Sequence, residues 1–187
     1  MPRYSLLFAL AFTAYAHAID ADPRFAEAER ISTAFSQQLL GTVKGAMSAG
    51  GTEQAIAVCQ VAAPNIASQH SQAPWQIART STKLRNTNNA PDAWEQSVLA
   101  AFAQDMATAP DKKPAPRTRV AAGEYRYMAP IIVAAPCLAC HGESLSATTQ
   151  AALEARYPDD RAVDYKLGEL RGALTLRQRI GLTETRH

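Results

Sequence analysis

The stretch Cys137-Leu138-Ala139-Cys140-His141 follows the pattern C-x-x-C-H, and the rest of the chain is arranged around it. In this pattern the two thiols form thioethers with the vinyl groups of a haem, and the histidine that follows binds the iron. Gly142 lets the backbone pass close to the ring, since glycine has no Cβ. The stretch therefore predicts one covalently attached haem c, with His141 as an axial ligand.

Two other kinds of site use a pair of cysteines at this spacing. A structural zinc site needs four ligands, and Cys59, His70 and His187 are the further candidates. A dithiol redox motif follows a strand–helix unit of the thioredoxin type, which the sequence before Cys137 lacks. A zinc or dithiol protein is the alternative to haem attachment.

The N-terminus predicts export, which this kind of haem attachment requires. Arg3 supplies a basic start, residues 6–15 form an apolar stretch too short to span a bilayer, and Ala16-His17-Ala18 resembles an A-x-A cleavage site. We therefore expect a signal peptide over residues 1–18, a periplasmic or otherwise exported location, and one domain over residues 19–187.

Charge and hydropathy exclude two classes of partner. The whole chain has 19 basic and 17 acidic residues, and loss of Arg3 with the signal peptide leaves 18 − 17 = +1. A charge this near zero gives no reason to expect nucleic acid, and no second apolar run is long enough to span a membrane. Cys59 is the one cysteine outside the motif, and an unpaired cysteine in an exported protein needs a role.

Three helices are predicted before the motif. Residues 22–47 have an Asp-Pro start and then apolar side chains at helical spacing. A second helix begins at Thr52, carries Cys59 on its apolar face, and is expected to kink or restart at Pro64 because proline lacks the backbone donor. A third helix begins at Pro91.

Strands are predicted mostly in the second half of the chain. They cover residues 75–80, 117–127, 130–135 and 170–176, with a short helix over 147–156. Helices first and strands later indicate an α+β fold with an antiparallel sheet. We expect the haem to lie against this sheet rather than inside a helical wrap.

Four segments of the chain resemble a family of c-type-haem domains with a PAS-like fold, long catalogued only as a domain of unknown function. The segments are Ala55–Cys59 with Ala63-Pro64 and Ile66-Ala67; Arg79–Ser81 with Lys83, Arg85-Asn86, Asn88, Pro91 and Trp94-Glu95; Tyr127 to Gly142; and Tyr157-Pro158 with Asp160, Ala162, Gly168 and Arg171–Ala173. Thr87 departs from the proline usual in the family. The resemblance implies a PAS-like antiparallel sheet with flanking helices, in exported monohaem cytochromes or external sensor domains.

The residues alone leave the second axial ligand open among six candidates, which are Cys59, His70, His187, Met47, Met106 and Met128. The resemblance implies Cys59, because it matches the helical cysteine that supplies the ligand opposite the histidine in that family. We therefore expect iron bound by His141 and the Cys59 thiolate. A thiolate stabilises ferric iron, so the reduction potential is expected to be low.

A basic cluster and two tyrosines are the other candidate haem contacts. Arg79, Lys83 and Arg85 are predicted to bind the haem propionates, or else to form a solvated loop. Tyr125 and Tyr127 either pack on the ring or belong to the sheet core.

The sequence thus predicts an exported monohaem cytochrome that carries electrons or senses redox state or a diatomic gas, rather than an enzyme. Its partner is expected to be an unidentified redox or signalling protein. A peroxidase-like haem enzyme is the alternative, and it requires an acid–base group beside an open ligand position.

Overall fold

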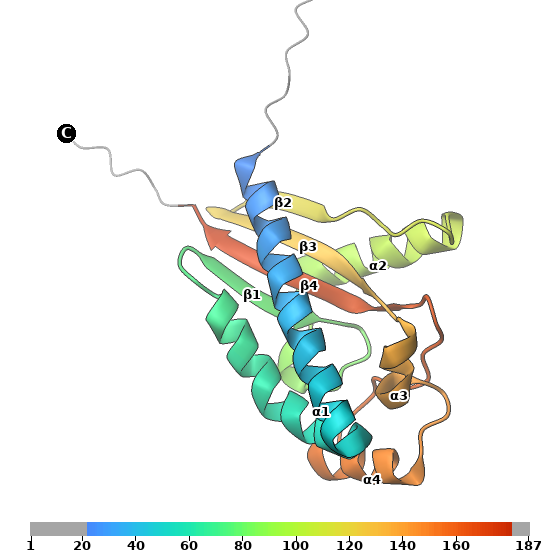
Figure 1. Cartoon of the computed structure of the whole chain (residues 1–187). Coiled ribbons are helices and arrows are strands. Elements are labelled where there is room, and N and C mark those ends of the chain that lie inside the picture. The colour runs from blue at the N-terminus through green and yellow to red at the C-terminus, as the bar shows by residue number, and fades with distance from the viewer. Residues whose placement is uncertain (1–21, 181–187) are drawn as a thin grey trace, which may run out of the picture.

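A four-stranded antiparallel sheet forms the centre of residues 22–180, the part of the chain that this computed structural model describes (Figure 1). In spatial order the strands are β1 (Trp75–Thr80), β4 (Leu170–Arg179), β3 (Glu124–Ile132) and β2 (Arg117–Ala121). Helices flank the sheet, so the predicted α+β architecture with an antiparallel sheet is confirmed. The expected signal peptide lies outside the described residues.

Helix α1 (Pro23–His70) has two arms that meet at Gly50 and Gly51. Gly51 has φ +68° and ψ −162°, a conformation that glycine adopts without a steric penalty. The first arm crosses one face of the sheet, and the second arm runs back beside it (Figure 1). The two predicted helices are therefore present, and the break lies between them where the glycines indicated.

The helix does not restart at Pro64, because the second arm keeps helical backbone angles through that residue. Ala63 and Ile66 are buried beside it, and Ile66 belongs to the main core cluster. Packing of these neighbours against the rest of the protein holds the helix across the missing backbone hydrogen bond, whose loss normally costs about 3 kcal/mol.

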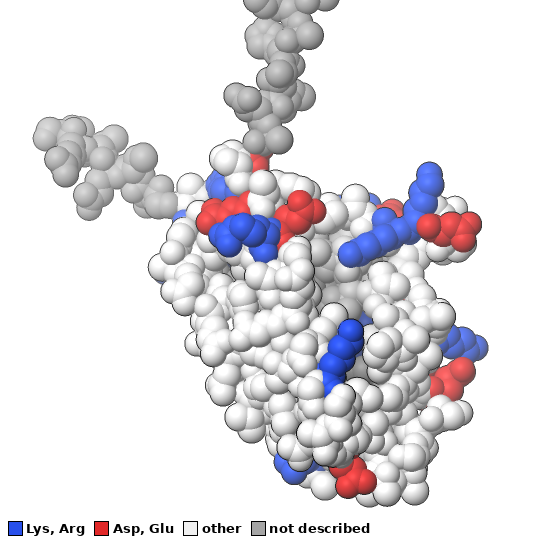
Figure 2. Space-filling view, in the orientation of Figure 1, with Lys and Arg blue, Asp and Glu red and all other residues white. Residues whose placement is uncertain are grey.

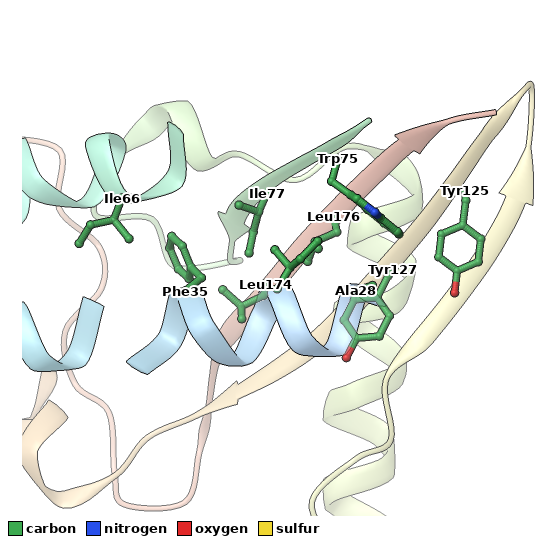
Figure 3. Packing of buried hydrophobic residues seen from close by; sticks show 10 residues of the cluster. Ala28, Phe35, Ile66, Trp75, Ile77, Tyr125, Tyr127, Leu174 and Leu176 are labelled. Atoms are coloured by element: carbon green, nitrogen blue, oxygen red, sulfur yellow. The ribbon is translucent and has the colours of Figure 1, made fainter. Parts of the chain in front are cut away.

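The main core lies between α1 and the sheet (Figure 3). It contains Ala28, Ile31, Phe35, Ile66, Trp75, Ile77, Tyr125, Tyr127, Leu174 and Leu176. Helix α2 (Ala93–Thr108) covers the opposite face, where Phe102 packs with Met128 and Ala173. Adjacent residues of β3 and β4 thus point into different layers, as the period of two in a strand requires.

The strand boundaries around residue 122 differ from the prediction. Ala122 and Gly123, at φ 52° and 73°, form a tight turn that divides the predicted strand 117–127. Strand β3 then continues through Pro130 instead of ending before it. Pairing with β2 ends at Met128, so Pro130 has a strand neighbour on only one side, which is where a sheet tolerates proline.

Two short elements and α4 close one end of the sheet. The 3-10 turn η2 (Ala135–Cys137) leads directly into α3 (Leu138–His141), and α4 (Ala147–Arg156) follows. The Thr52 and Thr149 hydroxyls, 2.6 Å apart, join the second arm of α1 to α4. Among residues 22–180 no helix is both long and apolar enough to cross a membrane.

Candidate functional site

A cavity of about 300 Å³ lies where both arms of α1 meet the end of the sheet and α3. Its lining includes Cys59 from the second arm together with Cys137, Cys140 and His141. The walls are otherwise largely apolar, with Leu39, Val43, Met47, Ile56, Ile131 and Leu174 among the lining residues. Three cysteines and a histidine from distant parts of the sequence therefore face one apolar space.

The His141 ring has a fixed orientation and a free ligand atom. Its Nδ1 lies 2.6 Å from the carbonyl oxygen of Ala162, to which the neutral imidazole donates, so the lone pair is left on Nε2. The Tyr165 ring packs edge-on against the imidazole, with 6.3 Å between the two ring centroids. Burial, together with the charges of Arg85 and Arg171, lowers the pKa of His141 to about 2. The imidazole is therefore neutral at physiological pH, as metal binding requires.

The low pKa of His141 makes the stability of the haem-free protein depend on pH. The unfolded chain binds a proton at this histidine below pH about 6.5, whereas the folded chain does not until about 2. We therefore expect the free energy of unfolding to fall with decreasing pH below 6.5, by up to about 1.4 kcal/mol per pH unit from this group.

Urea unfolding of the haem-free protein at pH 7, 6 and 5 measures this effect. His141→Gln is the matched control, because it keeps a hydrogen-bonding side chain and removes the titration. The variant should lose less stability than the wild type over the same range. Equal pH dependence of the two proteins would contradict a buried, neutral His141.

Cys59 lies in the second arm of α1, after the Gly50–Gly51 break, and is half-buried in the cavity wall. Burial raises the pKa of its thiol, and the charges of Arg79 and Arg85 act against that rise. The same cations surround Tyr157, whose pKa is raised by burial and by Cys59. The cavity thus holds a third thiol close to positive charge.

The other predicted axial ligands divide between the cavity and the rest of the protein. Met47 lines the cavity. Met106 lies on α2, and Met128 is buried in the cluster that α2 forms on the far face of the sheet. His70 lies 2.7 Å from Gln38 and packs edge-on against Phe35. His187 is outside the described residues.

The predicted basic cluster reaches the cavity, but its members differ in their contacts. Arg79 makes no side-chain hydrogen bond within residues 22–180, while Lys83 donates to the Val163 carbonyl at 3.1 Å. Arg85 donates to Asp160 and to the carbonyl of Cys140, so its guanidinium is already engaged. Arg171, to which the sequence assigned no role, also lines the cavity.

The cavity lining contains no carboxylate among the described residues. Figure 2 also shows an extended surface with few charged side chains over the arms of α1. In agreement, residues 54–78 contain no Asp, Glu, Lys or Arg. The second arm of α1 thus brings no charged side chain to the cavity, and the cations of the lining come from β1, the loop after it, β4 and Lys44 of the first arm.

Residues 15–178 match the model of the Tll0287-like family. The chain belongs to the Tll0287-like family. Among solved structures, a cyanobacterial heme-protein, Tll0287, is similar at 25% sequence identity and a TM-score of 0.59, covering 85% of this chain and 97% of that one. No curated protein gives a significant match. The family resemblance seen in the sequence is confirmed.

Other residues of this Tll0287-like chain were missed or left open by the sequence. Tyr157, Asp160 and Arg171 lie in the fourth segment of the family resemblance and had no assigned role. Asp160 contacts Arg85 across 75 positions and Arg171 contacts Ser81 across 90, so no local pattern indicates these contacts. Tyr125 and Tyr127 belong to the sheet core. Within residues 22–180 no three His, Cys, Asp or Glu side chains are grouped closely enough to hold a metal ion by themselves.

Proposed function

We propose that this chain is an exported monohaem c-type cytochrome that acts in electron transfer or in redox or diatomic-gas sensing. Cys137 and Cys140 hold the haem covalently, and His141 and Cys59 are the axial ligands. The observation that carries the proposal is the convergence of these four side chains on one apolar cavity in a member of the Tll0287-like family.

The donor set of the cavity fits a haem. Two thiols three residues apart suit thioether formation, and a neutral imidazole with a free Nε2 suits iron. Cys59 offers a second donor on a different helix. The similarity to a structure described as a heme-protein adds support. When bound, the haem supplies one-electron redox chemistry.

The cations of the cavity suit the haem carboxylates. Arg79 is largely buried and has no anionic partner among the described residues, which is costly for a charged side chain. Lys83 is exposed and also lines the cavity. We assign the propionates to these two residues, while Arg85 acts mainly on the motif itself through the Cys140 carbonyl.

The position of Cys59 bears on whether the protein is a carrier or a sensor. Cys59 lies on the arm beyond Gly50 and Gly51, so with iron bound, loss of the Cys59 ligand would free that arm from one attachment to the haem. A carrier keeps both ligands in both oxidation states, whereas a sensor loses or exchanges one. Absorption spectra of the ferrous protein with and without carbon monoxide distinguish the two roles.

Covalent attachment is tested by producing the whole chain in a host that matures c-type cytochromes. We expect haem to stay with the polypeptide on a denaturing gel and through acidic acetone extraction. The Cys137→Ala/Cys140→Ala variant should lose essentially all of this retained haem, because both thioethers are absent.

Cys59→Ala is the matched control, since it removes a third thiol from the same cavity and leaves the motif intact. It should retain its haem on the gel. Haem that is extracted from the wild-type chain, or a chain that takes up none, would contradict the proposal, and a chain that instead binds stoichiometric zinc would favour the alternative.

A further inference from the structure

A buried ion pair lies directly behind His141. Arg85, in the loop after β1, donates from Nε to Asp160 Oδ2 at 2.9 Å, and from Nη2 to the carbonyls of Cys140 at 2.5 Å and Ala162 at 3.3 Å. The side chains of Arg85 and Asp160 are only 14% and 7% exposed. One guanidinium therefore joins the motif helix to the segment that follows α4.

The contacts continue from this pair to the imidazole. Asp160 Oδ1 accepts from the backbone N–H of Ala162 at 2.8 Å, so the two carboxylate oxygens hold Arg85 and Ala162 together. The Ala162 carbonyl in turn accepts from Nδ1 of His141 at 2.6 Å. The links that run through Asp160 are thus hydrogen bonds of ordinary or short length, while the direct contact of Arg85 with the Ala162 carbonyl is longer, at 3.3 Å.

We propose that Arg85 and Asp160 are positioning residues that hold the Ala162 carbonyl against His141 Nδ1 and thereby set the donor strength of Nε2 toward iron. The proposal rests on the proposed function, because it takes Nε2 as an axial ligand. It assigns Arg85 a role other than propionate binding, and it assigns Asp160 a role where the sequence indicated none.

The physical reason is the effect of the outer hydrogen bond on a metal-bound imidazole. A carbonyl that accepts strongly from Nδ1 increases the electron density on Nε2 and fixes the ring orientation. A stronger donor favours the ferric state, so the intact pair should lower the reduction potential. The charge of Arg85 by itself acts the opposite way, because a nearby cation favours the ferrous state. Positioning and charge can therefore be separated by the sign of a shift.

Arg85→Lys is the main test, since lysine keeps the charge and cannot bind three acceptors in the same fork. In the haem-loaded protein we expect a midpoint potential raised by about 59 mV, a tenfold change in the ferrous-to-ferric ratio. The low-spin ferric paramagnetic resonance signal should also change. Asp160→Asn should raise the potential in the same direction, and the double variant should shift it by less than the sum.

Two controls keep the test sharp. Asp105→Asn removes a carboxylate from the exposed ion pair with Arg117 and should leave the potential unchanged. Arg85→Gln removes the charge and also serves if Arg85→Lys does not fold. A raised potential in this variant indicates that the loss of positioning dominates, and a lowered potential indicates that the loss of charge dominates. Unfolding by urea is measured for each variant, so that a change in stability is not mistaken for a change in ligation.

Several outcomes would overturn the inference. If only Asp160→Asn raises the potential, the pair acts through charge. If both variants lower stability and leave the potential and the ferric signal unchanged, the pair is merely structural. Either result leaves the proposed function standing, because the wild-type chain still contains haem. A wild-type chain with no haem absorption would overturn the proposed function and this inference together.

Discussion

Replacing Cys59 with alanine is expected to raise the reduction potential by roughly 0.1–0.3 V and to remove the thiolate-type low-spin ferric signal. Axial ligands set haem potentials over about 0.8 V, so the loss of an anionic ligand is a large fraction of that range. A thiolate donates strongly and stabilises ferric iron, and without it the ferrous state becomes easier to reach. The expected change is thus larger than any effect of the residues that surround the ligand.

Two cations of the cavity partly offset the effect of burial on the Cys59 thiol. Burial raises the pKa of the thiol, and the positive charges of Arg79 on β1 and of Arg85 in the loop after it reduce that rise without reversing it. Asp160 offsets the charge of Arg85, whereas Arg79 has no carboxylate partner among the described residues. A bound metal ion would favour the thiolate further, since a cysteine that coordinates a metal is deprotonated.

The measurement compares optical and paramagnetic resonance spectra and the midpoint potential of wild type and Cys59→Ala. Met47→Leu is the matched control, because Met47 supplies the other sulfur outside the motif that lines the cavity. Its spectrum and potential should stay close to those of the wild type. If Met47→Leu changes the spectrum and the potential while Cys59→Ala leaves both as in the wild type, the second ligand is Met47 and not Cys59.

The sequence was sufficient to predict features that depend on local chemistry. The C-x-x-C-H stretch, the strand at 75–80 and the helix at 147–156 coincide with elements of the structure. The alternation of Trp75 and Ile77 with exposed neighbours is the burial pattern of β1. Periodicity also placed Cys59 on the inner side of its helix, although only the fold shows that this side faces the motif.

Features that depend on distant partners were missed or mistaken. Pro64 was expected to kink or restart its helix, yet the helix continues through it, with Ile66 packed in the main core. The turn at Ala122 uses a positive φ that alanine rarely adopts, so the sequence carried only the weak signal of Gly123. The Arg85–Asp160 pair joins residues 75 positions apart, and no local pattern marks such a contact.

The far face of the sheet holds a second network that the sequence did not indicate. Arg126 of β3 and Arg177 of β4 are direct cross-strand partners, and like charges at such positions repel. Glu95 of α2 compensates both: its Oε1 lies 2.8 Å from Arg126 and 3.3 Å from Arg177, and it also accepts from Thr175 at 2.8 Å. The carboxylate is 4% exposed, so α2 is joined to the sheet by a buried charge.

Glu95→Ala is therefore expected to lower the free energy of unfolding by about 2–3 kcal/mol, because it removes a buried acceptor of charged and neutral donors. The variant removes one of two carboxylates that the arginines share, since Asp92 Oδ2 stays 2.7 Å from Arg126 and 3.0 Å from Arg177. It leaves the buried Thr175 hydroxyl without its acceptor. It also removes the hydrogen bond that the Asp92 backbone N–H donates to Glu95 Oε2, which completes the capping box of α2. Glu95→Gln should cost less, because an amide oxygen still accepts from Thr175 and Arg126. Urea unfolding, followed by far-ultraviolet circular dichroism, measures all three proteins.

Asp105→Ala provides the matched comparison, since it removes one partner of the exposed pair with Arg117 from the same helix. Its loss should be about 0–1 kcal/mol, as is usual for an exposed ion pair. The contrast isolates burial, because both substitutions delete a carboxylate of α2 that contacts an arginine of the sheet. Equal losses of stability for Glu95→Ala and Asp105→Ala would contradict this account. They would mean that solvent, and not the contacts with the two strands, stabilises the Glu95 carboxylate.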